Sequence, residues 1–226
     1  MKFTIKTPVN DLKKSTDFYK KLNFKSVTET MITDGIACIE LSNDTFARPS
    51  LVGYLNNDFS IIEKLQKITT VIEKEDFYLL SMPSGTWIYL NKKDIKLPKK
   101  EVQSFSILGK YSGVSIETIS IEKEKKIFEL FGFTQNMGDT SQGWITLKNN
   151  NGFIVSLMAP SLCPHLFINP SLTYFNGKEN NPKIIKKIRD LKIDIEQEIT
   201  HFSKDNTVDN IILRDKGGLG FFIFND

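Results

Sequence analysis

One stretch of this chain occurs twice. Residues 3–24 read as an extended run, an Asp-Leu pair and a helix that ends in Leu-Asn-Phe, and residues 113–133 repeat that order. The apolar positions keep a constant offset of 109 residues, so that Leu12, Phe18, Tyr19, Leu22 and Phe24 recur as Ile121, Ile127, Phe128, Phe131 and Phe133. A repeat of this kind indicates that one structural unit has been duplicated.

A second pattern is also repeated. Pro49-Ser50-Leu51 precedes a helix whose apolar positions return at a constant offset of 123 residues in the second half. Those positions are Ile61, Ile62, Leu65 and Ile68, and then Ile184, Ile185, Ile188 and Leu191. We expect the first of these helices to open with a capping box from Ser60 to Glu63, and the second to start at Asn181-Pro182. The chain therefore predicts four strand-helix-strands units in two similar pairs.

The two pairs are separated by a lysine-rich segment. Five lysines lie between Lys92 and Lys100, and Pro98 interrupts them, which is typical of a solvated linker. We therefore predict a first domain at residues 1–97, a linker at 98–112 and a second domain at 113–226.

The composition narrows the classes of partner. The 226 residues are 40% hydrophobic, which is enough for a core, and 30 basic against 27 acidic side chains leave a net charge of +3. This balance predicts neither nucleic-acid nor membrane binding. No apolar stretch approaches the roughly 20 residues of a membrane span, and the two cysteines suggest no disulfide framework. We expect a cytoplasmic monomer or homodimer whose partner is a small molecule.

The first strand has two different faces. Phe3, Ile5 and Val9 alternate with Thr4 and Lys6, so one face packs on helices while the other carries polar groups. Farther along, Asp34-Gly35 predicts a hairpin between two strands.

The order of these pieces resembles the vicinal oxygen chelate superfamily, which includes glyoxalase I, bleomycin-resistance proteins and extradiol dioxygenases. The likeness is carried by Val9-Asn10-Asp11-Leu12 with Leu22-Asn23-Phe24, by Ile119-Ser120-Ile121 with Phe131-Gly132-Phe133, and by the closing turns Met82-Pro83-Ser84-Gly85 and Asp215-Lys216-Gly217-Gly218. The resemblance covers nearly the whole chain. It implies an α+β fold of four βαβββ units, paired into two cups.

The resemblance also implies where a metal would be held. Enzymes of this superfamily commonly bind a divalent metal on the inner wall of the cup through His, Glu or Gln. The first ligand lies seven residues before the Asp of the Val-x-Asp-Leu pattern, which places it at Thr4 in the first half and at Gly113 in the second. The last ligand corresponds to Tyr89 and to Phe222.

The middle ligand falls within residues 50–52 of the first half and 171–173 of the second, which hold no imidazole or carboxylate. The two histidines, His165 and His201, lie away from the pattern positions. Because the required donors are absent, we expect no family-type metal site and no other cofactor.

The positions that remain suggest a small-molecule pocket. Strand alternation turns further side chains into the same cups, and aromatic walls with a few polar groups are typical of ligand pockets. The predicted ligand-binding residues are Thr4, Lys6, Trp87, Tyr89, Ser115, Glu117, Phe222 and Phe224. Phe222 and Phe224 can equally be core of a filled second cup. In the first cup, Lys6 favours a ligand, because a buried amine needs a partner.

Other chemistry-bearing residues give weaker signals. Glu117 is a weak candidate for a general base, with a salt bridge at the rim as the plainer interpretation. In Cys163-Pro164-His165 the thiol and imidazole are too close in sequence to reach each other productively. The glycines of 217–220 precede a strand, so they lack the helix N-terminus that a phosphate site uses.

Three functions remain open from the sequence. The first is a metal-independent protein that binds a small, partly aromatic or apolar molecule. The second is a lyase, isomerase or dioxygenase-type enzyme with unforeseen metal ligands. The third is a non-catalytic interaction protein whose cups are filled. Fold resemblance does not choose among them, because one fold hosts many chemistries.

Overall fold

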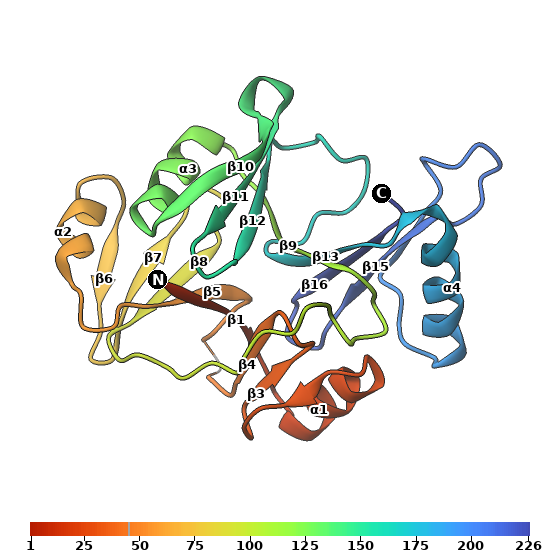
Figure 1. Cartoon of the computed structure of the whole chain (residues 1–226), viewed down its shortest axis with the longest axis horizontal. Coiled ribbons are helices and arrows are strands. Elements are labelled where there is room, and N and C mark those ends of the chain that lie inside the picture. The colour runs from red at the N-terminus through yellow and green to blue at the C-terminus, as the bar shows by residue number, and fades with distance from the viewer. Residues whose placement is uncertain (45) are drawn as a thin grey trace.

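Each half of the chain forms one eight-stranded mixed sheet in the computed structural model, which describes residues 1–44 and 46–226 (Figure 1). The strand order is β2-β3-β4-β1-β5-β8-β7-β6 in the first sheet and β10-β11-β12-β9-β13-β16-β15-β14 in the second. The first sheet consists of β1 (Lys2–Pro8), β2 (Lys25–Ser26), β3 (Met31–Thr33), β4 (Cys38–Ser42), β5 (Ser50–Tyr54), β6 (Val71–Glu73), β7 (Phe77–Ser81) and β8 (Trp87–Asn91). The second consists of β9 (Tyr111–Glu117), β10 (Phe133–Asp139), β11 (Trp144–Asn149), β12 (Ile154–Met158), β13 (Ser171–Phe175), β14 (Gln197–Ile199), β15 (Asn210–Arg214) and β16 (Gly220–Phe224).

The two sheets have the same topology. The first strand of each half pairs in parallel with the fourth and antiparallel with the fifth: β1 with β4 and β5, and β9 with β12 and β13. The fifth and eighth strands of each half are also parallel neighbours. The α+β class with paired modules, expected from the repeat, is confirmed.

Four helices connect the strands: α1 (Leu12–Lys21), α2 (Ser60–Gln66), α3 (Ile121–Leu130) and α4 (Gly177–Asp190), with a short 3-10 helix η1 (Thr140–Gln142). The repeated helices begin alike. Asp11 accepts a hydrogen bond from the Lys14 amide before α1, and Ser120 accepts one from the Lys123 amide before α3. Such caps satisfy an amide that has no partner within its helix. None of the helices in the described part of the chain is long and apolar enough to cross a membrane.

Two predictions about helix starts are wrong. Ser60 does not cap α2, because it lies inside the helix and Phe59 takes the cap position without a side-chain hydrogen bond. Helix α4 begins at Gly177, ahead of the predicted start at Asn181, so Pro182 lies inside it. The first turns of α4 are polar, so they carry none of the apolar spacing from which the helix was predicted.

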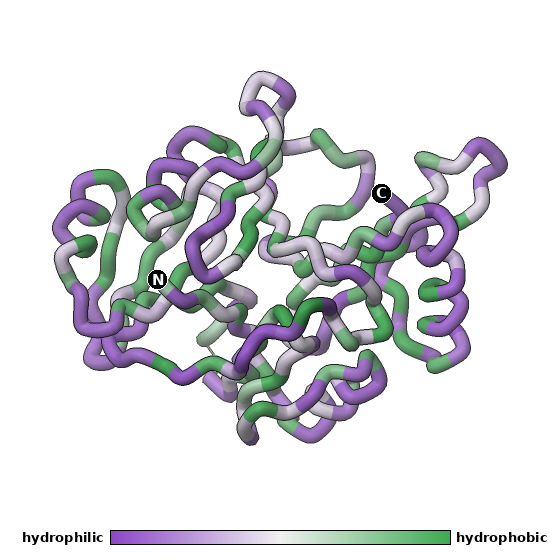
Figure 2. The backbone as a smooth tube through the Cα atoms, in the orientation of Figure 1, coloured by the Kyte–Doolittle hydropathy of each residue, from purple (hydrophilic) through white to green (hydrophobic). Residues whose placement is uncertain are grey.

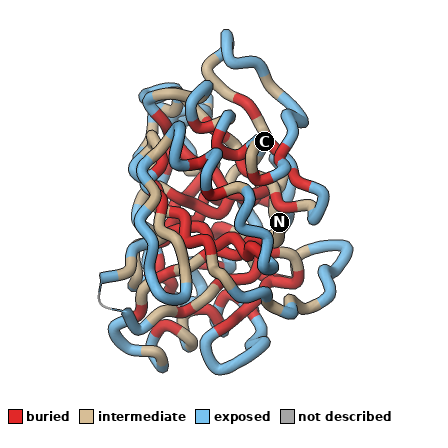
Figure 3. The backbone as a smooth tube through the Cα atoms, turned by 90° about the vertical axis from the view of Figure 1, so that its left-hand side faces the viewer, coloured by how far each residue is buried: buried red, intermediate tan, exposed pale blue. Residues whose placement is uncertain are grey.

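One core is shared by the two halves. A continuous cluster of buried apolar side chains joins residues of β1, β4 and β5 with residues of β9, β12 and β13. Phe3 of β1, for example, packs its ring 5.6 Å from that of Phe131 and 5.3 Å from that of Phe133. Figure 3 shows the buried segments gathered in this interior, and in Figure 2 helices α1 and α4 alternate hydrophobic and hydrophilic residues, as one-sided helices do.

The opposite face of each sheet carries a small separate cluster. Val52, Tyr54 and Tyr89 form one on the first sheet, and Ile199, Ile212 and Phe222 form the other on the second. Because side chains of a strand alternate between faces, these clusters point away from the shared core. We call these two faces the first cup and the second cup.

Two of the polar contacts between the halves are related to each other. Asp215, in the turn before β16, accepts hydrogen bonds from Thr7 on β1 and Tyr19 on α1. In the corresponding turn of the first half, Ser84 donates to Glu124 on α3. The closing turn of each half therefore binds at the first helix of the other half.

Candidate functional site

The strand register places the expected metal-ligand positions side by side. Thr4 on β1 is paired with Val52 on β5, and Val52 with Tyr89 on β8. In the second sheet the same row consists of Gly113, Thr173 and Phe222. The first and last ligand positions that the sequence pattern gives therefore lie in one row of each sheet. The middle ligand position in that row is Val52 in the first sheet and Thr173 in the second.

These rows do not fit the metal of the superfamily. None of the six side chains is an imidazole, a carboxylate or a thiolate, the groups that supply strong ligands for a transition metal. Within residues 1–44 and 46–226, no three His, Cys, Asp or Glu side chains are grouped so as to hold an ion elsewhere. The cup rows therefore lack the ligand set that such a metal would need.

In the first cup, Thr4 belongs to a hydrogen-bonded cluster. Its buried hydroxyl donates to Oε1 of Glu40 on β4, and the phenol of Tyr54 on β5 donates to the same oxygen. The two hydroxyl oxygens lie 3.3 Å apart. Burial is the main cause that raises the pKa of Tyr54, and the Glu40 carboxylate raises it further, so the phenol stays protonated and remains a donor.

Lys6 and the aromatic residues form the next part of this cup. The Lys6 ammonium lies 4.2 Å from the centroid of the Tyr89 ring, and the Arg48 guanidinium lies 3.8 Å from that of Trp87. Both are cation–π contacts. Cations of the chain itself therefore cover part of Trp87 and Tyr89, and neither ring lines the cavity described below.

The first cup contains a cavity of about 630 Å³. Lys6, Glu40 and Tyr54 contribute polar atoms to its wall, and Met31 and Ile95 contribute apolar ones. The volume lies in the range of small-molecule pockets, about 300–1,000 Å³. Thr4 is fully buried beneath this wall and supports Glu40 from behind.

Sequence reasoning missed Glu40 and Tyr54. The signal for Glu40 was present, because it lies between Ile39 and Leu41 in a strand whose alternation turns its carboxylate away from the core. Tyr54 lies in the strand after Pro49-Ser50-Leu51, and no local pattern singles it out. Its contact with Glu40 depends on β4 and β5 flanking β1, which the local pattern did not show.

The second cup is occupied by a loop of its own chain, residues 159–170. Phe167 packs its ring 5.0 Å from that of Phe222, which is only 1% exposed. The His165 ring lies 5.4 Å from Phe222 and 5.1 Å from Phe224. The expectation that His165 lies away from the pattern positions is therefore wrong, because the loop folds back over the sheet.

A glycine permits this close packing. A Cβ at Gly220 would collide with Ser171 and with Ile168 of the loop, whereas the equivalent position of the first sheet is Trp87. Gly220 thus lets the loop approach the second sheet closely, whereas the first sheet carries a large side chain at the equivalent position.

Ser115 and Glu117 take structural contacts in the second half. The buried Ser115 hydroxyl is 2.6 Å from that of Thr173. Glu117 exchanges two backbone hydrogen bonds with the Asn169 side chain, and its Oε2 accepts a hydrogen bond of 3.2 Å from the Ser161 amide. Glu117 therefore holds the loop at the rim through hydrogen bonds. The interpretation as a salt bridge is wrong, because none of the ion pairs among the described residues includes Glu117.

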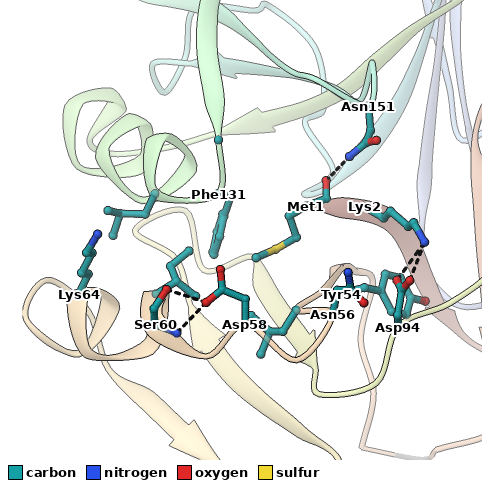
Figure 4. Close-up of a pocket in the computed structure, with 14 residues that line it drawn as sticks. Met1, Lys2, Tyr54, Asn56, Asp58, Ser60, Lys64, Asp94, Phe131 and Asn151 are labelled. Atoms are coloured by element: carbon teal, nitrogen blue, oxygen red, sulfur yellow. Dashed lines mark hydrogen bonds and ion pairs between the residues drawn. The ribbon is translucent and has the colours of Figure 1, made fainter.

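A second cavity of about 520 Å³ adjoins the first cup (Figure 4). It lies between helix α2 and the end of helix α3, and Met1, Asp58 and Phe131 line it. Tyr54 and Asp94 line both cavities. Lys2 closes an ion pair of 2.8 Å with Asp94 at this boundary.

Comparisons with known proteins identify the fold. No family model matches the chain, and no curated protein matches it by sequence. Solved structures of extradiol dioxygenases do match in three dimensions. One is 2,2',3-trihydroxybiphenyl 1,2-dioxygenase from Sphingomonas wittichii strain RW1, with a TM-score of 0.53 at 14% identity over 99% of this chain and 91% of that one.

Two further matches agree. Homoprotocatechuate 2,3-dioxygenase from Arthrobacter globiformis gives a TM-score of 0.54 at 12% identity over 97% of this chain and 78% of that one. An extradiol ring-cleaving dioxygenase from B. fuscum gives 0.57 at 14% identity over 99% and 72%. The chain therefore has the vicinal oxygen chelate fold that these dioxygenases share. At such low identity the likeness concerns the fold alone.

Proposed function

We propose that this protein binds a small, partly aromatic or apolar molecule in its first cup, without the metal that the superfamily's enzymes commonly use there. The observation that carries the proposal is the cavity of about 630 Å³, which lies over the cluster of Glu40 and Tyr54. Sequestration of such a molecule, as in a resistance protein, is a function that needs no reaction.

The wall of the cavity supports this choice. Met31 is paired with Glu40 across neighbouring strands, so both side chains lie on the cup face, one apolar and one charged. Ile95 extends the apolar part. Most of the remaining wall is polar or charged, so a ligand would contact the apolar part with its body and be oriented by the polar groups.

The contrast with the second cup also supports it. There Phe167 and Ile168 pack on the aromatic face of the sheet, and the positions of Lys6 and Glu40 are taken by Ser115 and Ser156. We therefore assign binding to the first cup. The cytoplasmic location and the monomeric or homodimeric state stay predictions.

A thermal-shift screen tests the proposal. A library of small aromatic and apolar compounds should contain members that raise the Tm of the protein. In a Ser42→Trp variant these shifts should disappear, because Ser42 lines the cavity and the indole would fill it. Asn136→Trp, on the exposed face of β10, is the matched control and should respond like the wild type.

The proposal is wrong if no compound stabilises the wild type, or if the Ser42→Trp variant responds as strongly as the control. Metal analysis of the purified protein tests the alternative of an enzyme with unforeseen ligands. A stoichiometric divalent metal would support that alternative.

A further inference from the structure

Two sets of charged groups at the first cup differ in their position. Two ion pairs lie at the rim, Lys2 with Asp94 at 2.8 Å and Lys93 with Asp76 at 3.3 Å. Exposed pairs of this kind neutralise each other and have little net effect on a ligand. Deeper in the cavity, Lys6 and Glu40 carry the charges that a ligand would meet.

Lys6 and Glu40 are neighbours that do not form an ion pair. They are paired positions on the parallel strands β1 and β4. Within the described residues, neither side chain forms an ion pair with a nitrogen–oxygen distance of 4.0 Å or less. The Lys6 ammonium has three donors, and within residues 1–44 and 46–226 it takes part in no side-chain hydrogen bond or ion pair. It lies over the face of Tyr89, a weak partner compared with an anion.

Glu40 is half satisfied. Both hydroxyls, from Thr4 and Tyr54, donate to Oε1, and in the part of the chain that the structure describes Oε2 accepts no hydrogen bond. Because Thr4 and Tyr54 hold Oε1 from the protein side, the carboxylate is fixed in orientation. A fixed acceptor and a cationic side chain therefore line one cavity, from paired positions on the adjacent strands β4 and β1.

From this arrangement we infer that the ligand of the first cup is a small organic acid with a hydrogen-bond donor next to its carboxylate. The carboxylate pairs with Lys6, a neighbouring hydroxyl donates to Oε2 of Glu40, and the apolar body contacts Met31 and Ile95. This inference rests on the proposed function, because it names the class of molecule bound at the same site. It requires a carboxylate and a hydrogen-bond donor on the same molecule.

Three compounds that share one ring separate the contributions. Mandelate carries the carboxylate and the hydroxyl, phenylacetate lacks the hydroxyl, and 1-phenylethane-1,2-diol lacks the carboxylate. Calorimetric titration of the full chain should give mandelate the lowest Kd. Loss of the carboxylate should weaken binding about tenfold, since hydrogen bonds between charged groups are the stronger ones, and loss of the hydroxyl should weaken it about threefold.

Variants assign these effects to residues. Lys6→Met keeps the length of the side chain, removes its charge and should abolish the preference for mandelate over the diol. Lys96→Met removes another lysine of the same cavity wall and should leave that preference intact. Glu40→Gln presents an amide donor in place of Oε2 and should remove the preference for mandelate over phenylacetate.

The outcomes are distinguishable. If the diol binds as tightly as mandelate, or if Lys6→Met keeps the preference, the inference about the organic acid is wrong while ligand binding in the cup stands. If Lys6→Met and Lys96→Met weaken mandelate equally, the effect is one of general charge and the inference is also wrong. If none of the three compounds binds at millimolar concentration, this inference fails, and the compound screen with Ser42→Trp separately decides on the proposed function.

Discussion

The phenol of Tyr19 donates a hydrogen bond of 2.7 Å to Oδ2 of Asp215, and so connects helix α1 of the first half with the closing turn of the second. The same carboxylate accepts hydrogen bonds from the hydroxyl of Thr7 and from the amides of Gly217 and Leu219. Four donors thus converge on one buried acidic side chain. The halves are joined by this polar contact as well as by their common core.

Replacing Asp215 with Asn should destabilise the protein although the two side chains have the same shape. The Asn amide nitrogen is a donor, and it would face either two hydroxyl donors or two amide donors. We expect the free energy of unfolding to fall by about 1–3 kcal/mol, the usual cost of leaving a buried polar group unsatisfied. Urea unfolding of the variant and the wild type measures this change in the free energy of unfolding. Tyr19→Phe removes one donor only and should cost less, so an Asn variant as stable as the wild type would contradict the proposed hydrogen-bond pattern.

Glu124 should make stability depend on pH in the acidic range. Burial raises the pKa of Glu124 above its ordinary value of 4.5 and outweighs the hydrogen bonds from Ser84 and Thr118, which lower it. A carboxyl with a raised folded pKa binds its proton more tightly in the native state, so it stabilises the fold most at low pH. That contribution should decline as the pH rises from about 4.5 through the folded pKa.

The difference in the free energy of unfolding between the wild type and Glu124→Gln isolates this effect, because Gln does not titrate. The difference should change in favour of the variant as the pH increases from 4 to 7, by about 1.4 kcal/mol for each unit of pKa shift. A difference that stays constant over this range, or changes in favour of the wild type, would show that the pKa of Glu124 is not raised.

Gly217 should tolerate no side chain. A Cβ at this position would collide with the backbone oxygen of Pro8 and with the hydroxyl of Thr7, both in the other half. Gly217→Ala should therefore destabilise the protein by about 1–3 kcal/mol, as overpacking does. Gly85→Ala in the equivalent turn is the control, because its Cβ would meet nothing within 4 Å and its cost arises from the left-handed backbone alone, about 1–2 kcal/mol.

Thermal or urea unfolding of the two glycine variants gives the comparison. A third protein, the Gly217→Ala variant with Thr7→Ala, should recover part of the loss, since one of the two colliding groups is then absent. No recovery, together with a loss no larger than that of Gly85→Ala, would indicate that the turn and β1 are farther apart than described.

Thr4 should contribute to stability through its hydroxyl. Thr4→Val keeps the shape of the side chain but removes the donor to Glu40, so we expect a loss of about 0.5–1.5 kcal/mol. Thr134→Val, whose exposed hydroxyl makes a long hydrogen bond of 3.4 Å, should change stability much less. Equal effects in chemical unfolding would argue against the cluster of Thr4, Glu40 and Tyr54.

Local sequence patterns predicted the repeated units of the fold and the strand positions that face each cup. The helical spacing of Leu12, Phe18 and Tyr19, and its recurrence after 109 residues, is a property of consecutive residues, so the duplication could be recognised. The same counting reached Thr4 and Tyr89, which the strand register places in one row with Val52. The absence of metal donors from these rows was therefore already evident in the sequence.

Only the tertiary structure decided which of the two cups holds a cavity and which polar groups gather there. Glu40 and Tyr54 reach Thr4 because β4 and β5 flank β1, and the strand order depends on contacts between residues far apart in the chain. The filling of the second cup depends in the same way on how loop 159–170 folds back over Phe222. Periodicity encodes which face of an element is apolar, whereas the neighbour that covers that face is set by the packing of the whole chain.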